Sequence, residues 1–277
     1  MKDTIKLKDG IIEEFIDLHI EVLKMILLGL SFEEIKYSLN EKFQEFNYDI
    51  ISSFFSLLHF NERGEVVRAY PISPIPTDIE ITVEGLGRGY AMCAIDSLGA
   101  AYLFGAKVEI YSVDSTTGIP IQIMIDPNQF QSESVPNVIV TMPKTVEESA
   151  FCCPHVRFLS LKGSEDIPEG AVSFGDAMKY GVTFFGRSNM RRKFRSRLLP
   201  LVRLYNSESL AVDELTKLYS ESPRFNLLSS LFPNDFGNIM VTMLCDRGVI
   251  EQQEALEGAR IVLTPKGKRI LNTFCRC

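Results

Sequence analysis

The sequence predicts an α+β protein in which a strand-rich middle section lies between two more helical ends. Residues 1–76 show mainly helical periodicity, residues 77–190 carry short alternating segments separated by turn residues, and helical periodicity returns over residues 191–277. A chain of 277 residues that is 45% hydrophobic and 23% charged is typical of globular proteins with two domains or three small ones.

The amino-terminal section, residues 1–76, is predicted to be a winged-helix-like domain. Ser31 and Glu34 have the spacing of a capping box, which marks the start of a helix. Three helices followed by a strand hairpin are the outline of a winged helix, and three prolines between positions 71 and 76 end the section. The expected elements are helices over 11–29, 32–39 and 49–60 and a strand over 65–70.

The middle section, residues 77–190, is predicted to be a mixed β-sheet with packed helices. Its glycine-rich segment 85–89 follows a strand, but the spacing of these glycines departs from that of a nucleotide-binding loop, so we read the segment as a turn. The expected elements are strands over 79–84, 107–113, 119–125, 138–142 and 156–161 and helices over 90–104 and 175–185.

The carboxy-terminal section, residues 191–277, is predicted to be a basic linker helix followed by a second winged-helix-like domain. A solvated connecting helix is the favoured interpretation of the basic segment, and contact with DNA phosphates is the less favoured one. Helices over 212–220, 236–247 and 266–274 and a strand pair at 249–252 and 260–263 are expected after it. The basic segment, residues 187–203, begins just before this section; it has no acidic residue and seven basic ones: Arg187, Arg191, Arg192, Lys193, Arg195, Arg197 and Arg203.

Charge and composition exclude several classes of protein. The net charge of −7 argues against a protein that coats nucleic acid. No apolar run approaches the ~20 residues of a membrane helix, and the first residues lack the features of a signal peptide, so we expect a cytoplasmic protein with reduced thiols. The six cysteines are Cys93, Cys152, Cys153, Cys245, Cys275 and Cys277.

Two cysteine segments carry the chemistry. Cys93 and Asp96 are three residues apart at the start of a predicted helix, which puts both side chains on nearly one face. A helix amino terminus favours the thiolate, and Cys152 and Cys153 supply further sulfur. Two thiolates beside an acid suit protonolysis of a carbon–mercury bond, because thiolates bind soft mercury and a positioned acid can protonate the carbon.

These motifs resemble those of the organomercurial (alkylmercury) lyase family. Residues 90–98, Tyr-Ala-Met-Cys-Ala-Ile-Asp-Ser-Leu, match the family's Tyr-Ala-x-Cys-Ala-Leu-Asp-x-Leu apart from Ile95. Residues 151–158 are similar to its Phe-Cys-Cys-His-Val-His-Phe, with Pro154 inserted and Arg157 changed. The elements at 117–120 and 138–143 follow in the family's order, and the resemblance covers roughly residues 15–190.

The resemblance implies a role for each site residue. Cys93 and Cys152 would hold the metal, Asp96 would donate the proton and also face the metal, and Cys153 would be an accessory ligand. The substrate would be an organomercurial or another organometal, and Hg(II) would leave with external thiols or a mercuric reductase-like acceptor, with no tightly bound cofactor. Met92 stands where the family often has Trp, so the pocket wall is expected to differ.

Other interpretations of the cysteines stay open. Free cysteines are often simply buried small hydrophobic residues, and Cys245 is read in this way. Cys275 and Cys277 are expected in a disordered tail. The alternative function is a thiol-based metal-sensing or organometal-sensing winged-helix transcriptional regulator, in which the cysteines report occupancy. In an apolar helix, the Asp96 carboxyl is expected to keep its proton near neutral pH.

Overall fold

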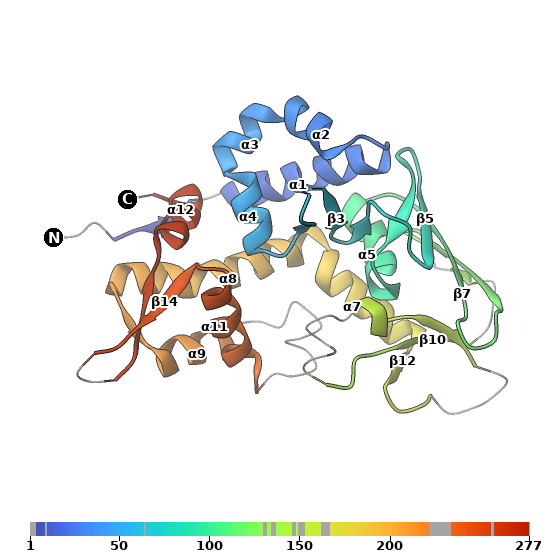
Figure 1. Cartoon of the computed structure of the whole chain (residues 1–277). Coiled ribbons are helices and arrows are strands. Elements are labelled where there is room, and N and C mark those ends of the chain that lie inside the picture. The colour runs from blue at the N-terminus through green and yellow to red at the C-terminus, as the bar shows by residue number, and fades with distance from the viewer. Residues whose placement is uncertain are drawn as a thin grey trace. The chain divides into compact units, whose positions relative to one another are not determined.

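The structure is a computed structural model with an α+β architecture (Figure 1). It divides into two compact units, and neither is continuous along the chain. Unit 1 comprises residues 1–17, 41–55 and 191–277, and unit 2 comprises residues 18–40 and 56–190. The structure describes residues 4–8, 10–63, 65–129, 132–133, 137–145, 148, 153–161, 167–221, 234–255 and 258–276.

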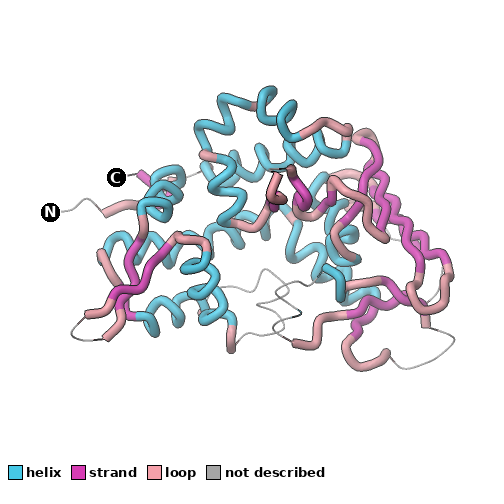
Figure 2. The backbone as a smooth tube through the Cα atoms, viewed as in Figure 1, coloured by secondary structure: helices cyan, strands magenta, loops and turns pink. Residues whose placement is uncertain are grey.

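Unit 2 is built on an eight-stranded sheet, seen as adjacent magenta segments in Figure 2. Its order is β2-β3-β4-β6-β5-β7-β8-β9, and each neighbouring pair is antiparallel. The strands are β2 (Leu58–Phe60), β3 (Val66–Ala69), β4 (Ile72–Ser73), β5 (Ile79–Val83), β6 (Gly87–Ala91), β7 (Val108–Val113), β8 (Pro120–Ile125) and β9 (Ser132–Glu133).

The prediction of a mixed sheet is wrong for the strands that the structure describes. Most consecutive strands are joined by short turns, which produce antiparallel pairs. The helical connection α5 (Ala94–Phe104) does join two strands of the same direction, β6 and β7. However, β5 lies between these two strands and pairs with both, so the crossover creates no parallel ladder.

A smaller antiparallel sheet and two packed helices complete the core of unit 2. The sheet has the order β11-β10-β12, with β10 (Val138–Thr141) at its centre, β11 (Phe158–Ser160) and β12 (Ala171–Ser173). Helix α7 (Phe174–Phe185) packs against α5 (Figure 1). Their closest approach uses two glycines: a Cβ on Gly181 would lie 3.0 Å from the backbone nitrogen of Gly99.

Two helix predictions in this region need correction. The helix expected over 90–104 begins only at Ala94, because residues 87–91 form strand β6 and pair with β5. The helix expected over 49–60 is α4 (Tyr48–Phe54), which ends before Ser56, a residue with a positive φ of 60° that a helix does not accept. Residues 58–60 are therefore a strand, and an additional helix, α3 (Asn40–Phe46), precedes α4.

Other helices of the amino-terminal section follow the prediction. α1 (Ile11–Leu27) covers most of the expected span. α2 (Phe32–Ser38) begins at a capping box in which the backbone N–H of Glu34 donates to the Ser31 hydroxyl, while the Ser31 backbone N–H donates to the Glu34 carboxylate at 2.8 Å.

Unit 1 combines helices with a small antiparallel sheet of order β13-β15-β14. A two-stranded pairing of β1 (Lys6–Leu7) with β16 (Cys275–Arg276) joins residues near the two ends of the chain. The remaining elements of its carboxy-terminal part are α8 (Arg187–Ser207), β13 (Leu210–Ala211), α9 (Val212–Ser220), α11 (Phe236–Asp246), β14 (Ile250–Gln253), β15 (Arg260–Leu263) and α12 (Pro265–Phe274).

The core of unit 1 is aromatic. The rings of Phe55 and Phe194 stack with their centroids 4.1 Å apart, and the Phe15 ring lies 5.7 Å from that of Phe274 in an edge-to-face arrangement. Such pairs add to the free energy gained by burying their area.

Helix α8 is not simply a solvated connecting helix, because two of its cations, Lys193 and Arg197, are buried. Arg197 Nη1 donates to the Phe55 carbonyl at 3.1 Å, and burial together with the charge of Arg247 lowers the pKa of Arg197 to about 10. Arg247 Nη1 donates to the carbonyls of Ser53 and Phe54 at 3.1 and 2.9 Å. Both guanidiniums thus satisfy backbone carbonyls at the carboxyl end of α4, where cations are favoured.

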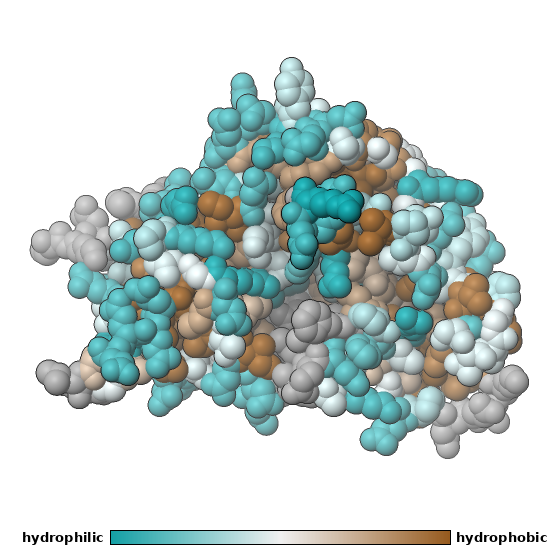
Figure 3. All heavy atoms as spheres, viewed as in Figure 1, coloured by the Kyte–Doolittle hydropathy of each residue, from teal (hydrophilic) through white to brown (hydrophobic). Residues whose placement is uncertain are grey.

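Among the described residues, none of the helices has the length and apolarity needed to cross a bilayer. On the face drawn in Figure 3, hydrophobic side chains appear as separate groups among hydrophilic ones.

Candidate thiol and carboxylate centre

Cys93 lies at the junction between the sheet and helix α5. It is the N-cap residue of α5, with extended backbone angles of φ −160° and ψ 177°, and its thiol makes no capping hydrogen bond. Neighbouring backbone groups fix the junction: Met92 N donates to Pro71 O at 3.2 Å, and Ala94 N donates to Val156 O at 3.0 Å. The side chain is only 3% exposed, so the thiol is held in a buried position at a helix amino terminus.

Asp96 is the third residue of α5 and is 2% exposed. The sequence predicted that its carboxyl would lie near Cys93, and this proximity is confirmed. Cys93 caps the helix rather than belonging to it, but the cap and the third helical residue still present their side chains to the same place.

The second thiol of the centre comes from Cys153, in a short 3-10 turn, η1 (Cys153–His155). Its Sγ lies 4.0 Å from Asp96 Oδ2, and the thiol is placed to donate to this carboxylate. The turn is tied to the smaller sheet by the Thr141 hydroxyl, which donates to the His155 carbonyl at 2.6 Å. Pairing of β10 with β11 therefore brings Cys153 to Asp96 from 57 positions along the chain.

The two sulfurs and a carboxylate oxygen form a compact cluster. The ligand atoms of Cys93, Asp96 and Cys153 all lie within 4.8 Å of one another. Two thiolates are a preferred ligand set for a soft metal ion, and a carboxyl within the same cluster adds a group that can exchange a proton.

Cys152 lies outside the described residues, so its predicted role as the second metal-binding thiolate stays a prediction. Cys153, expected from the resemblance to be only an accessory ligand, is the thiol that the structure places beside Asp96. The inserted Pro154 immediately after it is one of the two features, with Arg157, that distinguish this segment from the family pattern.

Tyr70 is a neighbour of the centre that the sequence did not indicate. Its hydroxyl lies 4.0 Å from Cys153 Sγ, and its ring stacks on Phe185 with a centroid distance of 5.7 Å. The buried His19 fixes the backbone at this point, because its Nε2 lies 2.9 Å from the Tyr70 carbonyl. Tyr70 precedes β4 at a strand end, a position that carries no recognisable sequence signal for a site residue.

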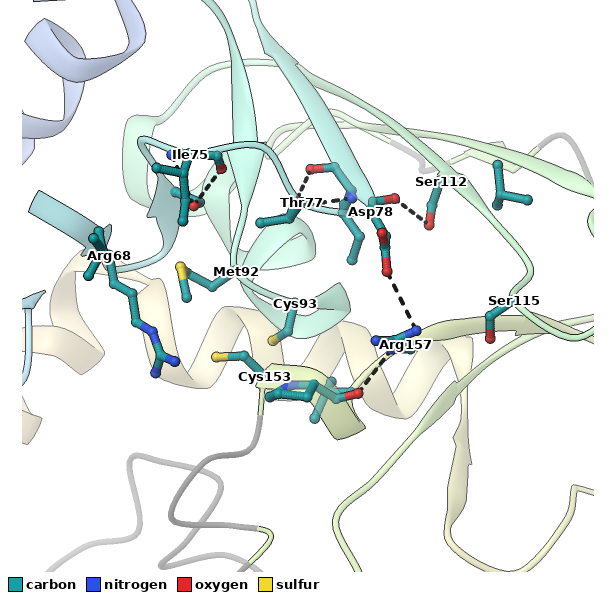
Figure 4. A pocket seen from close by; sticks show the side chains of 16 residues that line it. Arg68, Ile75, Thr77, Asp78, Met92, Cys93, Ser112, Ser115, Cys153 and Arg157 are labelled. Atoms are coloured by element: carbon teal, nitrogen blue, oxygen red, sulfur yellow. Dashed lines mark hydrogen bonds and ion pairs between the residues drawn. The ribbon is translucent and has the colours of Figure 1, made fainter. Parts of the chain in front are cut away.

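A cavity of about 280 Å³ opens next to the centre. Figure 4 shows Cys93 and Cys153 with their sulfurs close together, Met92 beside them, and Arg68 and Arg157 on the surrounding wall. The predicted pocket position of Met92 is confirmed. The volume is near the lower limit of ~300 to 1,000 Å³ that small-molecule pockets occupy.

The remaining described cysteines, Cys245 and Cys275, lie in unit 1. Cys245 is half-buried in α11, and burial together with the neighbouring Asp246 raises the pKa of its thiol. Cys275 is buried and belongs to β16, so the expectation of a disordered tail is wrong at this residue. Cys277 lies outside the described residues.

The antiparallel α+β fold and the pair of thiols, one buried and one half-buried, beside a buried carboxyl are compatible with a protein that binds a soft metal through cysteine. Residues 72–165, which contain this cluster, match the family model of the alkylmercury lyase MerB. The resemblance to organomercurial lyases is therefore confirmed for the middle of the chain.

Individual relatives agree with the family match. The chain is 32% identical over 133 residues to an alkylmercury lyase of Bacillus cereus, and the same figures apply to one of Clostridium butyricum. The alignments cover 45% of this chain and 60% of the length of these relatives. A solved structure described as the mercury-bound form of MerB2 matches with a TM-score of 0.39 and 17% identity, over 67% of this chain and 93% of that chain.

Proposed function

We propose that the protein is an organomercurial lyase that breaks a carbon–mercury bond and releases a hydrocarbon and Hg(II). The observation that carries this proposal is the cluster of Cys93, Asp96 and Cys153, whose ligand atoms lie within 4.8 Å of one another. The cluster combines two soft ligands with a buried carboxyl, and the match of residues 72–165 to alkylmercury lyases supports the same reaction.

The reaction begins with a substrate R–Hg–X, in which X is a thiol ligand. The Cys93 thiolate attacks mercury and displaces X. In this scheme Asp96 begins as a carboxylate, in place of the protonated form expected from the sequence. The Cys153 thiol, which points toward it at 4.0 Å, transfers its proton to Asp96, and its sulfur becomes the second ligand of mercury. Electron donation from two thiolates increases the negative charge on the attached carbon, which prepares the carbon for protonation.

Asp96 completes the reaction as the acid. Its new proton passes to the carbon, the electron pair of the carbon–mercury bond stays with that carbon, and R–H leaves. Asp96 returns to the carboxylate and Hg(II) remains on two sulfurs. External thiols or an acceptor protein such as a mercuric reductase then remove the metal, and no resident cofactor takes part in the cycle.

The choice of second thiolate is part of the proposal. Cys153 is chosen because its thiol lies 4.0 Å from Asp96, and Cys152, which the resemblance to the family indicates, remains the alternative. Comparing Cys152→Ser with Cys153→Ser decides between them, because the true second ligand is required for turnover and the other cysteine is not. Cys245→Ser is the matched control, since that thiol belongs to helix α11 in unit 1.

The test is turnover of phenylmercury in the presence of excess thiol, measured as benzene released per enzyme. We expect many turnovers with the native chain and with Cys245→Ser. Cys93→Ser should release almost no benzene, and Asp96→Asn should lower the rate by about 10² to 10⁴-fold, the usual contribution of a general acid. Binding of one equivalent of phenylmercury without benzene release would contradict the proposal.

We also propose that both flanking sections are winged-helix-like and serve as packing modules. In the carboxy-terminal section this is supported by the element order α8-β13-α9-α11-β14-β15 and the sheet order β13-β15-β14. In the amino-terminal section it is supported by helices that precede the β2–β3 hairpin. The DNA-binding regulator has less support, because α11, at the position of a recognition helix, contains no lysine or arginine.

A further inference from the structure

Two arginines line the cavity next to the thiols, and their surroundings differ. Arg157 is held in place, because its Nη1 lies 3.5 Å from Asp78 Oδ2 and its Nε donates to the Pro154 carbonyl at 2.9 Å. The charge of Arg157 is therefore already balanced by a neighbouring carboxylate.

Arg68 has no such partner among the residues that the structure describes. It lies on β3, opposite His59 in the β2–β3 register, and is half-buried. Figure 4 shows its side chain extending along the cavity, with the guanidinium on the side where the Cys153 sulfur lies. A partly desolvated cation without a counter-ion is poised to gain free energy when an anion binds next to it.

Three of the hydroxyl groups that line the cavity already donate hydrogen bonds within the protein. Ser73 Oγ donates to Ile75 O at 2.7 Å, Thr77 Oγ1 donates to Ala91 O at 2.7 Å, and Ser112 Oγ donates to Asp78 O at 3.2 Å. Among the described residues that line the cavity, the Arg68 guanidinium is thus the strongest hydrogen-bond donor left for a ligand.

We propose that Arg68 forms an anion-binding subsite that recognises a carboxylate carried by the organomercurial substrate. This inference rests on the proposed lyase function. Because Arg68, Cys93 and Cys153 line one cavity of about 280 Å³, a small ligand bound through mercury to the thiols can place a carboxylate against the guanidinium. Guanidinium–carboxylate pairs are short, charge-assisted and frequently bidentate.

The carboxylate has two possible sources in the substrate R–Hg–X. It belongs either to the organic group R or to the thiol ligand X that accompanies mercury into the site. The first arm of the test therefore compares phenylmercury with 4-carboxyphenylmercury in 2-mercaptoethanol. The second arm keeps phenylmercury and compares 2-mercaptoethanol with 3-mercaptopropionate.

Each arm measures kcat/KM for the native chain, Arg68→Gln and Arg68→Lys. We expect Arg68→Gln to lower kcat/KM at least about 10-fold when the organomercurial or the thiol carries a carboxylate. When both are neutral, the loss should be less than about 3-fold. Arg68→Lys should recover part of the loss, because it keeps the charge but not the bidentate geometry. Arg88→Gln, which removes a 76%-exposed arginine paired with Glu80, is the matched charge control.

Equal losses for neutral and carboxylate-bearing combinations in both arms would overturn the subsite and leave Arg68 with a structural role. If the native chain turns over none of the substrates, the lyase proposal fails instead. Equilibrium competition between the protein and free thiol for 4-carboxyphenylmercury and phenylmercury then tests the subsite separately. The preference for the carboxylate form must fall in Arg68→Gln, and an unchanged preference refutes the inference.

Discussion

The hydroxyl of Tyr70 lies 4.0 Å from the Sγ of Cys153, although 83 positions separate the two residues in the chain. Stacking on Phe185 restricts rotation of the Tyr70 ring, so the hydroxyl is held close to the Cys153 thiol. A phenol at this position can donate a hydrogen bond to the thiolate that forms when Cys153 gives up its proton.

Tyr70→Phe should therefore slow the reaction without disturbing the fold. Loss of one hydrogen bond is worth about 0.5 to 1.5 kcal/mol, which corresponds to about a 2- to 10-fold fall in kcat. Alkylation of Cys153 by iodoacetamide at fixed pH should slow as well, measured by mass spectrometry of the modified peptide. Tyr37→Phe, at a side chain 87% exposed, is the control, and equal rates in the two variants would remove Tyr70 from the site.

Asp114 should make unit 2 sensitive to acid. Burial by itself raises the pKa of this carboxyl, but hydrogen bonds from the N–H groups of Ser160, Thr116 and Thr117 and from the Ser160 hydroxyl outweigh burial and lower the pKa to about 2. Because the folded-state pKa is below the ordinary value of 3.8, the stabilisation is complete above that pH and is lost as pH falls toward 2.

Asp114→Asn should lower the free energy of unfolding at neutral pH by about 2 kcal/mol, since each pKa unit corresponds to 1.36 kcal/mol. The difference between variant and native chain should shrink between about pH 4 and pH 2. Chemical denaturation at several pH values measures both effects. Asp126→Asn, at a carboxylate that accepts a hydrogen bond from Asn128 N at 2.8 Å, should lower the free energy of unfolding less. A pH-independent difference for Asp114→Asn would contradict the assignment.

The contact of α5 with α7 should tolerate no added methyl group at Gly181. A Cβ there would lie 3.0 Å from Gly99 N and 3.2 Å from Leu98 C, both backbone atoms of the helix that begins at the site. We expect Gly181→Ala to destabilise the protein by about 1 to 3 kcal/mol and to lower activity, because α5 must shift. Gly175→Ala, whose Cβ would meet nothing nearer than Ser173 Oγ at 3.9 Å, should be neutral or slightly stabilising in a thermal melt.

Arg247 should be one of the stronger single contributors to the stability of unit 1. Arg247→Met removes the side-chain donor of the Ser53 and Phe54 carbonyls, and a buried acceptor left without a partner costs about 1 to 3 kcal/mol. Arg203→Met removes an exposed pair with Glu214 and should cost less than about 1 kcal/mol. Urea titrations of the two variants would refute this ranking if both midpoints moved equally.

Local patterns predicted most elements of the fold. Helix α1, the capping box of α2, strands β5, β7 and β8, and the β14–β15 pair all follow from periodicity and turn residues within their own segments. The start of α5 did not, because residues 87–91 are recruited into the sheet by pairing with β5, a tertiary contact that overrides local propensity.

The candidate site was predictable only in part. Cys93 and Asp96 are three positions apart in one motif, so their proximity could be inferred from helical geometry. Arg68 comes from β3 and Tyr70 from the turn between β3 and β4, and their place near Cys153 depends on the order of the eight-stranded sheet and on the pairing of β10 with β11. No local spacing encodes such long-range register, and the burial of Arg197 against Phe55 depends on a contact between residues 142 positions apart.

Unit 1 is formed by three separate segments of the chain, so its core cannot be completed until the last segment has been synthesised. Phe15 and Phe55 emerge from the ribosome early, but their ring partners Phe194 and Phe274 belong to the last third of the sequence. Until those residues are synthesised, the aromatic side chains of Phe15 and Phe55 lack these packing partners and remain exposed on the nascent chain. Cutting the chain after residue 190 to isolate the residues around the thiols would make that exposure permanent, and such a fragment should aggregate.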